Sequence, residues 1–465
     1  MRNKSQKRGC LRAGFVWGAR VVVILVLIAV AAFGIVFRKP LYNRFVLFPR
    51  QQKAWDAIRA KRVTPPLRYA WNEYRGIMHN HTELSHDSAV SPEEILGVLK
   101  KCDLDFIFTS DHCDNGVADY SKGWKGLHDG KLFVRGYEMS KGFMPWGLPD
   151  DTVLRNDDDP HNTARKIAEA GGVLFFAHCE EPRLWNLEEL TGIEIYNLHV
   201  DVKDENFKTL IPDMLFSIRK YPDQTFRLIF DRPTPFLERL DTLNRSQKIV
   251  GIGANDAHQN QGVRFIYTPN NTLLLKSTSG DSDDANIKEF NLNALSRLAL
   301  RILFGPLELG RQIYRFDLDK YETSARYVNT HILARNLTEK DLIEALRAGR
   351  VFVAFDAIAD ARGFVWIAEG LQGKAAIGES IPFDPAVKLR AAAPHEARFT
   401  VIQDGKQIAQ GIGFDFDFIP PGPGKFRVEA ELEIRGEWTP WIYSNYLELA
   451  AATKLAPVPA LAPAP

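Results

Sequence analysis

Cysteine, net charge and long hydrophobic runs are all scarce in this sequence. Its 465 residues include only four cysteines, too few for a disulfide-built scaffold. The formal net charge is +1, and we find neither a basic stripe nor a recognition motif, so we expect no nucleic-acid partner. The length is enough for one large domain and a smaller one. A long apolar run occurs near the N-terminus and nowhere else.

That run extends from Val21 to Phe37, follows a basic segment, and is closed by Arg38 and Lys39. It shows no polar face, which argues against a helix buried in a soluble core. We expect a single-pass anchor in the bacterial inner membrane, with residues 1–20 cytoplasmic and the remainder periplasmic by the positive-inside rule. A cleaved signal peptide is the alternative, because Ala29-Val30-Ala31 resembles a cleavage site, although the apolar run continues beyond it.

The rest of the chain divides by its patterns. From Tyr74 onward, strand-like apolar runs alternate with amphipathic helices, which predicts an α/β fold with a mostly parallel sheet. Later strands alternate around Gly and Pro turns, which favours a small β-sandwich. The expected parts are a transmembrane anchor at 21–37, a connector at 38–73, a metal-binding barrel at 74–355 with a helical insertion at about 270–335, a sandwich at 356–450 and a disordered Pro/Ala tail at 451–465. The helix expected at 292–309 would either cover the barrel or lie on the membrane.

Metal-binding residue types recur where the apolar runs end. The segments are GIMHNHTELSHD, FIFTSDH, LFVRGYE, VLFFAH, IEIYNLH and IVGIGANDAH. Because the carboxyl ends of parallel strands meet at one rim, the polar residues that follow these runs should converge there. His79-x-His81 would point two imidazoles to one side of a strand, as chelation of one ion requires. A single such histidine is usually a satisfied core residue, but that does not explain the recurrence.

The ordered set HNHTELSHDS, TSDH, GYE, AHCEEP, EIYN and NDAH resembles the polymerase-and-histidinol-phosphatase (PHP) family of metal-dependent phosphoesterases. The resemblance covers about residues 74–269, with weaker echoes in LIEALRAGRVFVAF and SNYLEL. It implies a distorted (β/α)7 barrel with two or three metal ions at the carboxyl-terminal rim of its strands. Carried over by motif, the expected metal ligands are His79, His81, Asp87 or His86, His112, Glu138, His178, His199, Asp256 and His258.

Within that resemblance, Glu138 would bridge two ions, and Glu138, Asp256 and His258 would act in catalysis. His86 stands where the simplest form of the motif has an aspartate, so either His86 or Asp87 could bind; Asp87 is preferred, because S-x-D-[GS] is also a common form in the family. His199 is the least secure member, because the spacing after EIYN varies in the family. A nitrogen-rich ligand set suits Zn, Mn or Fe better than Mg or Ca. Candidates for a phosphate clamp are Arg135, Arg155, Arg183, Arg232 and Arg264.

The expected function is hydrolysis of a small or lipid-linked phosphate ester. An amidohydrolase-like C–N or C–O hydrolase is a second possibility, but that class usually carries a metal-bridging lysine, and none stands at a strand end here. A non-catalytic metal-binding sensor or scaffold is a third. Cys113 and Cys179 each follow an expected ligand, so they could form a disulfide in an oxidising compartment; two buried free thiols are the alternative.

Overall fold

The computed structural model describes residues 3–203, 205–278, 286–317 and 319–451. The chain forms two compact units, which we call the helical unit (Met1–Lys53 with Asn206–Thr225) and the sheet unit (Ala54–Glu205 with Phe226–Pro465). The fold is mixed α/β, and most strands belong to one large sheet in the sheet unit. All the expected metal ligands belong to the sheet unit.

The helical unit joins the N-terminal helices to a segment from the middle of the chain. Its elements are α1 (Asn3–Val36), α2 (Arg38–Tyr42), the π-helical turn η1 (Asn43–Leu47), the start of α3 (Phe48–Arg59), α7 (Phe207–Ser217) and most of α8 (Pro222–Phe226). Among the described residues, no single helix combines the length and apolarity that crossing a membrane requires. The pair Arg20–Val36 and Arg38–Arg59, bent by 80°, meets both criteria together. The anchor therefore stays a prediction.

Seven strands of the sheet unit pair in a nearly closed circuit, whose two ends are linked by an isolated bridge rather than by a strand pairing. They are β1 (Asn72–Asn80), β2 (Phe106–Phe108), β6 (Lys131–Val134), β8 (Phe143–Trp146), β10 (Val173–Phe176), β11 (Leu190–Asn197) and β12 (Val250–Ala257). Parallel pairing runs β6-β2-β1-β12-β11-β10. β8 pairs antiparallel with β10, and a bridge between Gly136 and Trp146 leads back towards β6. Some connections, such as β10 to β11, contain no helix, so the circuit lacks the regular alternation expected of a (β/α)7 barrel.

Alternate side chains of these strands form the core. One cluster collects Met78, Phe108, Val134, Trp146 and Phe175 with the corresponding residues of β12, all buried. The intervening residues of the same strands, including Ile77, Ile107 and Phe133, point to the opposite face. They pack in a second cluster with α4 (Pro92–Lys101) and α11 (Tyr321–Tyr327). This two-residue period is what a strand with two buried faces requires.

Helix caps stand where the sequence indicates them. Ser91 accepts a hydrogen bond from the Glu94 amide at 3.2 Å at the start of α4. Asp159 accepts one from the Asn162 amide at 2.9 Å at the start of α5 (Pro160–Glu169). Each cap satisfies an amide that the first helical turn leaves unpaired, and each is followed by a proline at the first helical position.

The insertion expected to be helical, at about residues 270–335, contains the helix expected at 292–309 but also several strands, which corrects the helical prediction for the rest of it. β13 (Gly262–Tyr267), β14 (Thr272–Ser277), β15 (Asn286–Asn291) and β16 (Gln312–Asp317) form a four-stranded antiparallel sheet in the order β15-β14-β13-β16. Its helix is α10 (Ala294–Phe304), and Leu295 and Ile302 on it are each 75% exposed. Leu273–Leu275 is too short and uniform an apolar run to reveal its period. The sequence also predicts a polar loop at 277–284, and residues 279–284 of it lie outside the described residues.

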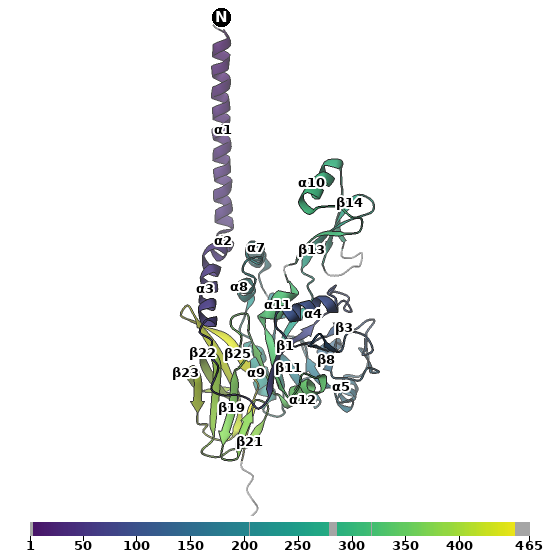
Figure 1. The fold of residues 1–465 in the computed structure, drawn as a ribbon, viewed down its shortest axis with the longest axis vertical. Helices are drawn as coiled ribbons and strands as arrows, with labels where there is room; N and C mark the ends of the chain where they lie inside the picture. Colours follow the sequence, from purple (N-terminus) through teal and green to yellow (C-terminus); the bar gives the residue numbers. More distant parts are fainter. Residues whose placement is uncertain (1–2, 204, 279–285, 318, 452–465) are drawn as a thin grey trace, which may run out of the picture. The chain divides into compact units, whose positions relative to one another are not determined.

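The C-terminal strands extend the large sheet. β17 (Asn329–Ala334) pairs with β1, β18 (Val351–Ala354) pairs with β17, and β25 (Glu437–Ser444) pairs with β18. Around them lie α12 (Glu339–Ala348), β19 (Val365–Gly370), β20 (Gly373–Ala376), β21 (Ser380–Pro382), β22 (Lys388–Gln403), β23 (Lys406–Phe418), β24 (Gly424–Ile434) and β26 (Leu447–Ala450). The long strands β22 and β23 run side by side (Figure 1) and turn at Asp404-Gly405, both with positive φ, as a tight hairpin requires. A separate sandwich at 356–450 stays a prediction.

Candidate metal centre

The end of β1 holds His79, the first histidine of the H-x-H motif, in strained backbone. The β1–β12 register shifts between Met78 and Asn80, and His79 lies in that shift with φ +56°. His178, just after β10, has φ +49°, and Asp256, in β12, has φ +47°. Non-glycine residues adopt this conformation at a cost of about 1–3 kcal/mol, and such strain gathers at functional sites. Three expected ligands therefore share a costly backbone geometry.

Glu138 lies between imidazoles that come from three directions. Its Oε2 is 3.4 Å from His79 Nε2, 3.6 Å from His81 Nε2 and 3.4 Å from His112 Nδ1. Its Oε1 is 3.1 Å from His178 Nε2. Glu138 reaches this position from β7 (Tyr137–Glu138), which pairs in parallel with β3 (Asp111–His112). A carboxylate whose two oxygens face different imidazoles is placed to bridge two cations.

Asp256, like Glu138, is a carboxylate that faces several imidazoles. Its Oδ1 is 3.5 Å from His79 Nε2, 3.3 Å from His81 Nε2 and 3.5 Å from His258 Nδ1. Its Oδ2 is 3.5 Å from His178 Nε2. Asp256 is buried in β12, so the strand pairing with β1 and β11 fixes its position.

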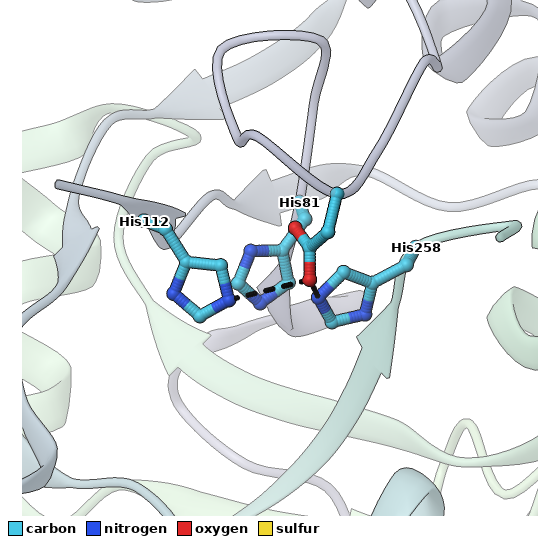
Figure 2. A group of neighbouring side chains, drawn as sticks. His81, His112 and His258 are labelled. Atoms are coloured by element: carbon cyan, nitrogen blue, oxygen red, sulfur yellow. Dashed lines mark ion pairs between the residues drawn. The ribbon is translucent and has the colours of Figure 1, made fainter. Parts of the chain in front are cut away.

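A third carboxylate, Asp87, joins the outer histidines. Its Oδ2 is 3.6 Å from His112 Nε2 and 3.2 Å from His258 Nε2. Figure 2 shows the rings of His81, His112 and His258 turned towards one another, with the rings of His81 and His258 stacked at 3.9 Å. His86 is exposed; its ring centroid lies 5.1 Å from that of His112. The structure thus places Asp87 rather than His86 among the converging ligand atoms.

These side chains form four overlapping groups, in each of which the ligand atoms lie within 4.8 Å of one another. The groups are His79, His81 and Glu138; His79, His178 and Asp256; His81, Asp87, His112 and His258; and His199, Asp256 and His258. His199 enters from α6 (Leu198–Lys203), directly after β11. Nine of the ten residues named from the sequence therefore meet in one place, from separate strand ends.

The hydrogen bonds of the ring nitrogens leave the opposite nitrogens pointing into the centre. His79 Nδ1 donates to Glu194, and His81 Nδ1 donates to Ser85 Oγ at 2.9 Å. His258 Nδ1 donates to the backbone oxygen of Asp256 at 3.0 Å. When one ring nitrogen donates in this way, the other presents its lone pair, the form in which imidazole binds a metal.

The residues that hold the ligands were not recognised in the sequence. Glu194, buried inside β11, contacts His79, accepts from the His178 amide at 2.9 Å and accepts from Asn197 at 3.0 Å. Ser85 Oγ donates to Asp111 Oδ1 at 3.1 Å while it accepts from His81. A glutamate in an otherwise apolar strand run was the one available signal, because a buried charge needs a partner.

The ligand pKa values show strong mutual electrostatic effects. Burial opposes the charge on Glu138 and on Asp256, but the neighbouring imidazoles, His79 foremost, outweigh it and hold both pKa values well below their usual range. Burial opposes the charge on His178, yet hydrogen bonds to Glu138 and Glu180 raise its pKa to about 10. Burial and the nearby His258 lower the pKa of His81 to about 3. The ionised carboxylates here need positive charge beside them, which protonated imidazoles or bound metal ions can provide.

The donor set fits a metal cluster. Buried atoms without a hydrogen-bond partner among the described residues include His79 Nε2, His81 Nε2, His258 Nε2, Glu138 Oε2 and Asp256 Oδ1. All five are the atoms that face the middle of the centre. Leaving such atoms unpaired in the interior is costly, and metal coordination would satisfy all of them. Imidazole with a minority of carboxylates suits Zn, Mn or Fe.

Of the five arginines considered as a phosphate clamp, Arg183 has a contact beside a ligand. Its Nε donates to the Ala177 oxygen at 2.9 Å, next to His178. Arg135 contacts Asp150 at 2.7 Å, Arg232 pairs with Glu429, and Arg264 donates to the Ser277 oxygen at 3.2 Å. Arg155 is exposed on β9 (Val153–Arg155).

The two cysteines beside the centre are free thiols, so the disulfide considered from the sequence is not formed in this structure. Cys113 Sγ contacts the Glu138 oxygen at 3.8 Å, and Cys179 Sγ contacts the Phe176 oxygen at 3.5 Å. The thiols follow different loops and lie against different backbone carbonyls. Burial raises the pKa of both, which keeps them protonated at neutral pH.

Comparison with known proteins yields little. No protein-family model matches the chain, and no curated protein matches it significantly. One similar solved structure is the crystal structure of a two-domain protein from Bacteroides vulgatus that contains a predicted PHP-like metal-dependent phosphoesterase. The sequences are 12% identical, the match covers 82% of this chain and 96% of that one, and the TM-score is 0.36. So distant a likeness fixes neither the fold nor the chemistry of this chain.

Proposed function

We propose that this protein hydrolyses phosphate esters through two or three divalent Zn, Mn or Fe ions, held at the mouth of a distorted (β/α)7 barrel. The observation that carries the proposal is the sharing of ligands between groups. Glu138 faces four imidazoles, and Asp256 belongs to two of the four groups. A centre built for one ion has no use for such sharing, whereas adjacent ions need bridging carboxylates.

When bound, the ions would supply Lewis acidity, which polarises a phosphoryl group and lowers the pKa of water. The chain itself supplies position and charge. Glu138 and Asp256 would supply the carboxylate charge that holds the ions. Glu194 and Ser85 fix the rings of His79 and His81 in the tautomer that presents Nε2. Arg183, beside His178, is the best-placed cation for a phosphate oxygen.

An amidohydrolase-like reaction and a non-catalytic sensor fit the centre less well. Amidohydrolases commonly have a metal-bridging lysine, whereas the side chain that faces four imidazoles here is the carboxylate of Glu138. A vestigial site would lack ligands, whereas nine expected ligands converge here. Three of them, His79, His178 and Asp256, also have a strained backbone.

The test is hydrolysis by the full chain, stripped of metal and reloaded with Zn, Mn or Fe. The substrates are p-nitrophenyl phosphate and bis-p-nitrophenyl phosphate, one monoester and one diester. We expect metal-dependent turnover that His79→Ala and Asp256→Ala abolish, with circular dichroism unchanged. His161→Ala, in α5 and outside the four ligand groups, is the matched control and should keep full activity. A folded, metal-loaded protein inert towards both esters would refute the proposal.

A further inference from the structure

The helical unit exposes a long apolar surface on α1. Most side chains from Val22 to Val36 on this helix are large, apolar and exposed to solvent; Val22 is 59% exposed and Ile35 is 71% exposed. Soluble monomers rarely leave so large an apolar patch in water. The surface therefore needs an occupant, and its length and uniformity match acyl chains better than the mixed surface of a protein partner.

Helix α7 packs against the C-terminal end of this apolar helix. The Phe216 ring lies 6.0 Å from that of Phe33 and 5.4 Å from that of Phe37, the last residues of the apolar run. Below them, Asn43 Nδ2 donates to Asp213 Oδ1 at 2.8 Å, and both side chains are buried. A buried polar pair of this kind fixes α7 at one height along the N-terminal helices.

The exposed residues at that height are those found where a membrane meets water. Ile211 and Leu215, four residues apart on one face of α7, are 42% and 59% exposed. Tyr42 and Phe45 are 50% and 70% exposed, and Arg38 and Lys39 follow the apolar run directly. Aromatic and basic residues beside an apolar helix are typical anchors at the lipid headgroups.

The segment containing α7 is inserted between two elements that carry ligands. It follows α6, which holds His199, and precedes β12, which holds Asp256. Helix α7 begins at Phe207, eight residues after His199, and eight residues of fully extended chain span at most about 28 Å. A short tether of chain therefore joins α7 to a residue of the metal centre.

We propose that α7 and the end of α1 dock on a lipid bilayer, and that the metal centre consequently acts on a phosphoester carried by a membrane amphiphile. This substrate class rests on the proposed phosphoesterase function, whereas the docking does not. The bilayer takes up α1, the exposed face of α7 lies among the headgroups, and eight residues of chain tether α7 to His199.

The docking is tested on the full chain in phospholipid nanodiscs. The photo-reactive residue p-benzoylphenylalanine replaces Leu215 or, as a matched exposed leucine in the sheet unit, Leu371, which is 81% exposed. Mass spectrometry then detects covalent lipid adducts. We expect lipid adducts at position 215 and at least tenfold fewer at 371. Adducts at 215 to a second copy of the chain, or none, would overturn the docking.

The substrate class is tested with matched long-chain and short-chain esters. Dioleoyl phosphatidic acid and dioleoyl phosphatidylglycerol in the nanodisc are compared with their soluble dibutyryl forms, each at equal bulk concentration. We expect at least tenfold faster hydrolysis of one long-chain ester than of its short-chain form. Ile211→Ser with Leu215→Ser should lower the long-chain rate about tenfold and leave the short-chain rate unchanged, because neither residue belongs to the metal centre.

The outcomes separate the two proposals. Equal rates for long and short chains, or hydrolysis of p-nitrophenyl phosphate alone, would overturn the membrane-borne substrate and leave the phosphoesterase intact. Lipid adducts at position 215 without hydrolysis of any ester would overturn the phosphoesterase and leave the docking intact.

Discussion

Glu138 is the single residue whose charge the centre depends on most, because it faces His79, His81, His112 and His178. Glu138→Gln keeps the size of the side chain but removes the charge and one acceptor oxygen. We expect a loss of phosphoesterase activity of roughly 100-fold or more, since loss even of a ligand's supporting partner costs 10–100-fold. Steady-state kinetics on the metal-loaded protein measures it. Glu83→Gln, an exposed carboxylate on the loop after β1, should behave as wild type; equal activity in the two variants would contradict the bridging role.

Glu194 acts through His79 rather than on the metal. Glu194→Gln can still accept from the His79 ring but no longer carries the charge that favours the donated proton. We expect metal affinity to fall by about 10–100-fold, with less loss than in Glu194→Ala, which cannot accept at all. Titration of the apo protein with Zn, followed by calorimetry, measures the affinity. Unchanged affinity in both variants would show that Glu194 only fills space.

The metal-binding residues could be predicted from the sequence, but the residues that hold these ligands in position could not. Ligands such as His112 and Asp256 follow short apolar runs, so their convergence could be inferred from strand order. Glu194, Ser85 and Asp111 are common residue types whose value lies in contacts made only after folding. The choice between His86 and Asp87 likewise depended on the course of one loop, which spacing does not determine.

At the scale of elements, β17 is tied to its neighbours by a buried charge. His331, in β17, pairs through Nδ1 with Glu73 at 2.7 Å and through Nε2 with Asp356 at 2.9 Å. Burial opposes its charge, but Asp356 and Glu73 prevail and raise the pKa of His331 to about 9. Because folding raises the pKa of His331, its protonation stabilises the folded chain. This contribution is fully present below the unfolded pKa of about 6.5 and is lost as the pH rises through about 9.

We therefore expect the free energy of unfolding to fall between pH 6.5 and 9.5, by up to about 3 kcal/mol from this group. His331→Gln should be less stable at pH 6 and should show a flatter dependence on pH. Denaturant midpoints at several pH values measure both effects. His128→Gln, a partly exposed histidine stacked on Trp124, is the control. Parallel pH profiles for wild type and His331→Gln would refute the assignment.

The contact between α9 (Thr234–Leu243) and β24 depends on a buried ion pair. Arg427 donates to both oxygens of Asp241, at 2.7 and 2.8 Å, and both side chains are buried. Asp241→Ala removes both of these hydrogen bonds and leaves the buried guanidinium paired with Glu429 through Nη1, so we expect a loss of about 3 kcal/mol in unfolding free energy. Glu369→Ala, which removes a more exposed partner of Arg390, should cost about 1 kcal/mol or less. Equal losses in the two variants would contradict the account.

Elements with clear local signals were predictable from the sequence, and elements defined by distant contacts were not. Ser91 and Asp159 marked helix starts, and Asp404-Gly405 marked a hairpin. By contrast, the strands β14, β15 and β16 were taken for part of a helical region because their apolar runs show no decisive period. The pairing of residues 206–225 with the N-terminal helices joins positions about 170 residues apart, as in Asn43 with Asp213.

At the scale of the whole molecule, the metal centre is assembled from many separate segments. Its ligands come from β1, β3, β7, β12, α6 and the loops that follow β1, β10 and β12. Such a site forms only when the circuit of strands closes, so metal binding should stabilise the folded chain as a whole. Because the ligands come together only on folding, each sequence motif can indicate a ligand but not the number of metal ions in the centre.

The central claim is a shared, multi-ion centre, and the number of metal ions bound per chain tests it most directly. Inductively coupled plasma mass spectrometry of the full chain, loaded with Zn or Mn and then desalted, gives that number. The account predicts two or three ions in wild type and in His161→Ala, and at least one fewer in Glu138→Gln. A folded wild-type chain that retains one ion or none, with Glu138→Gln identical to it, would contradict the account.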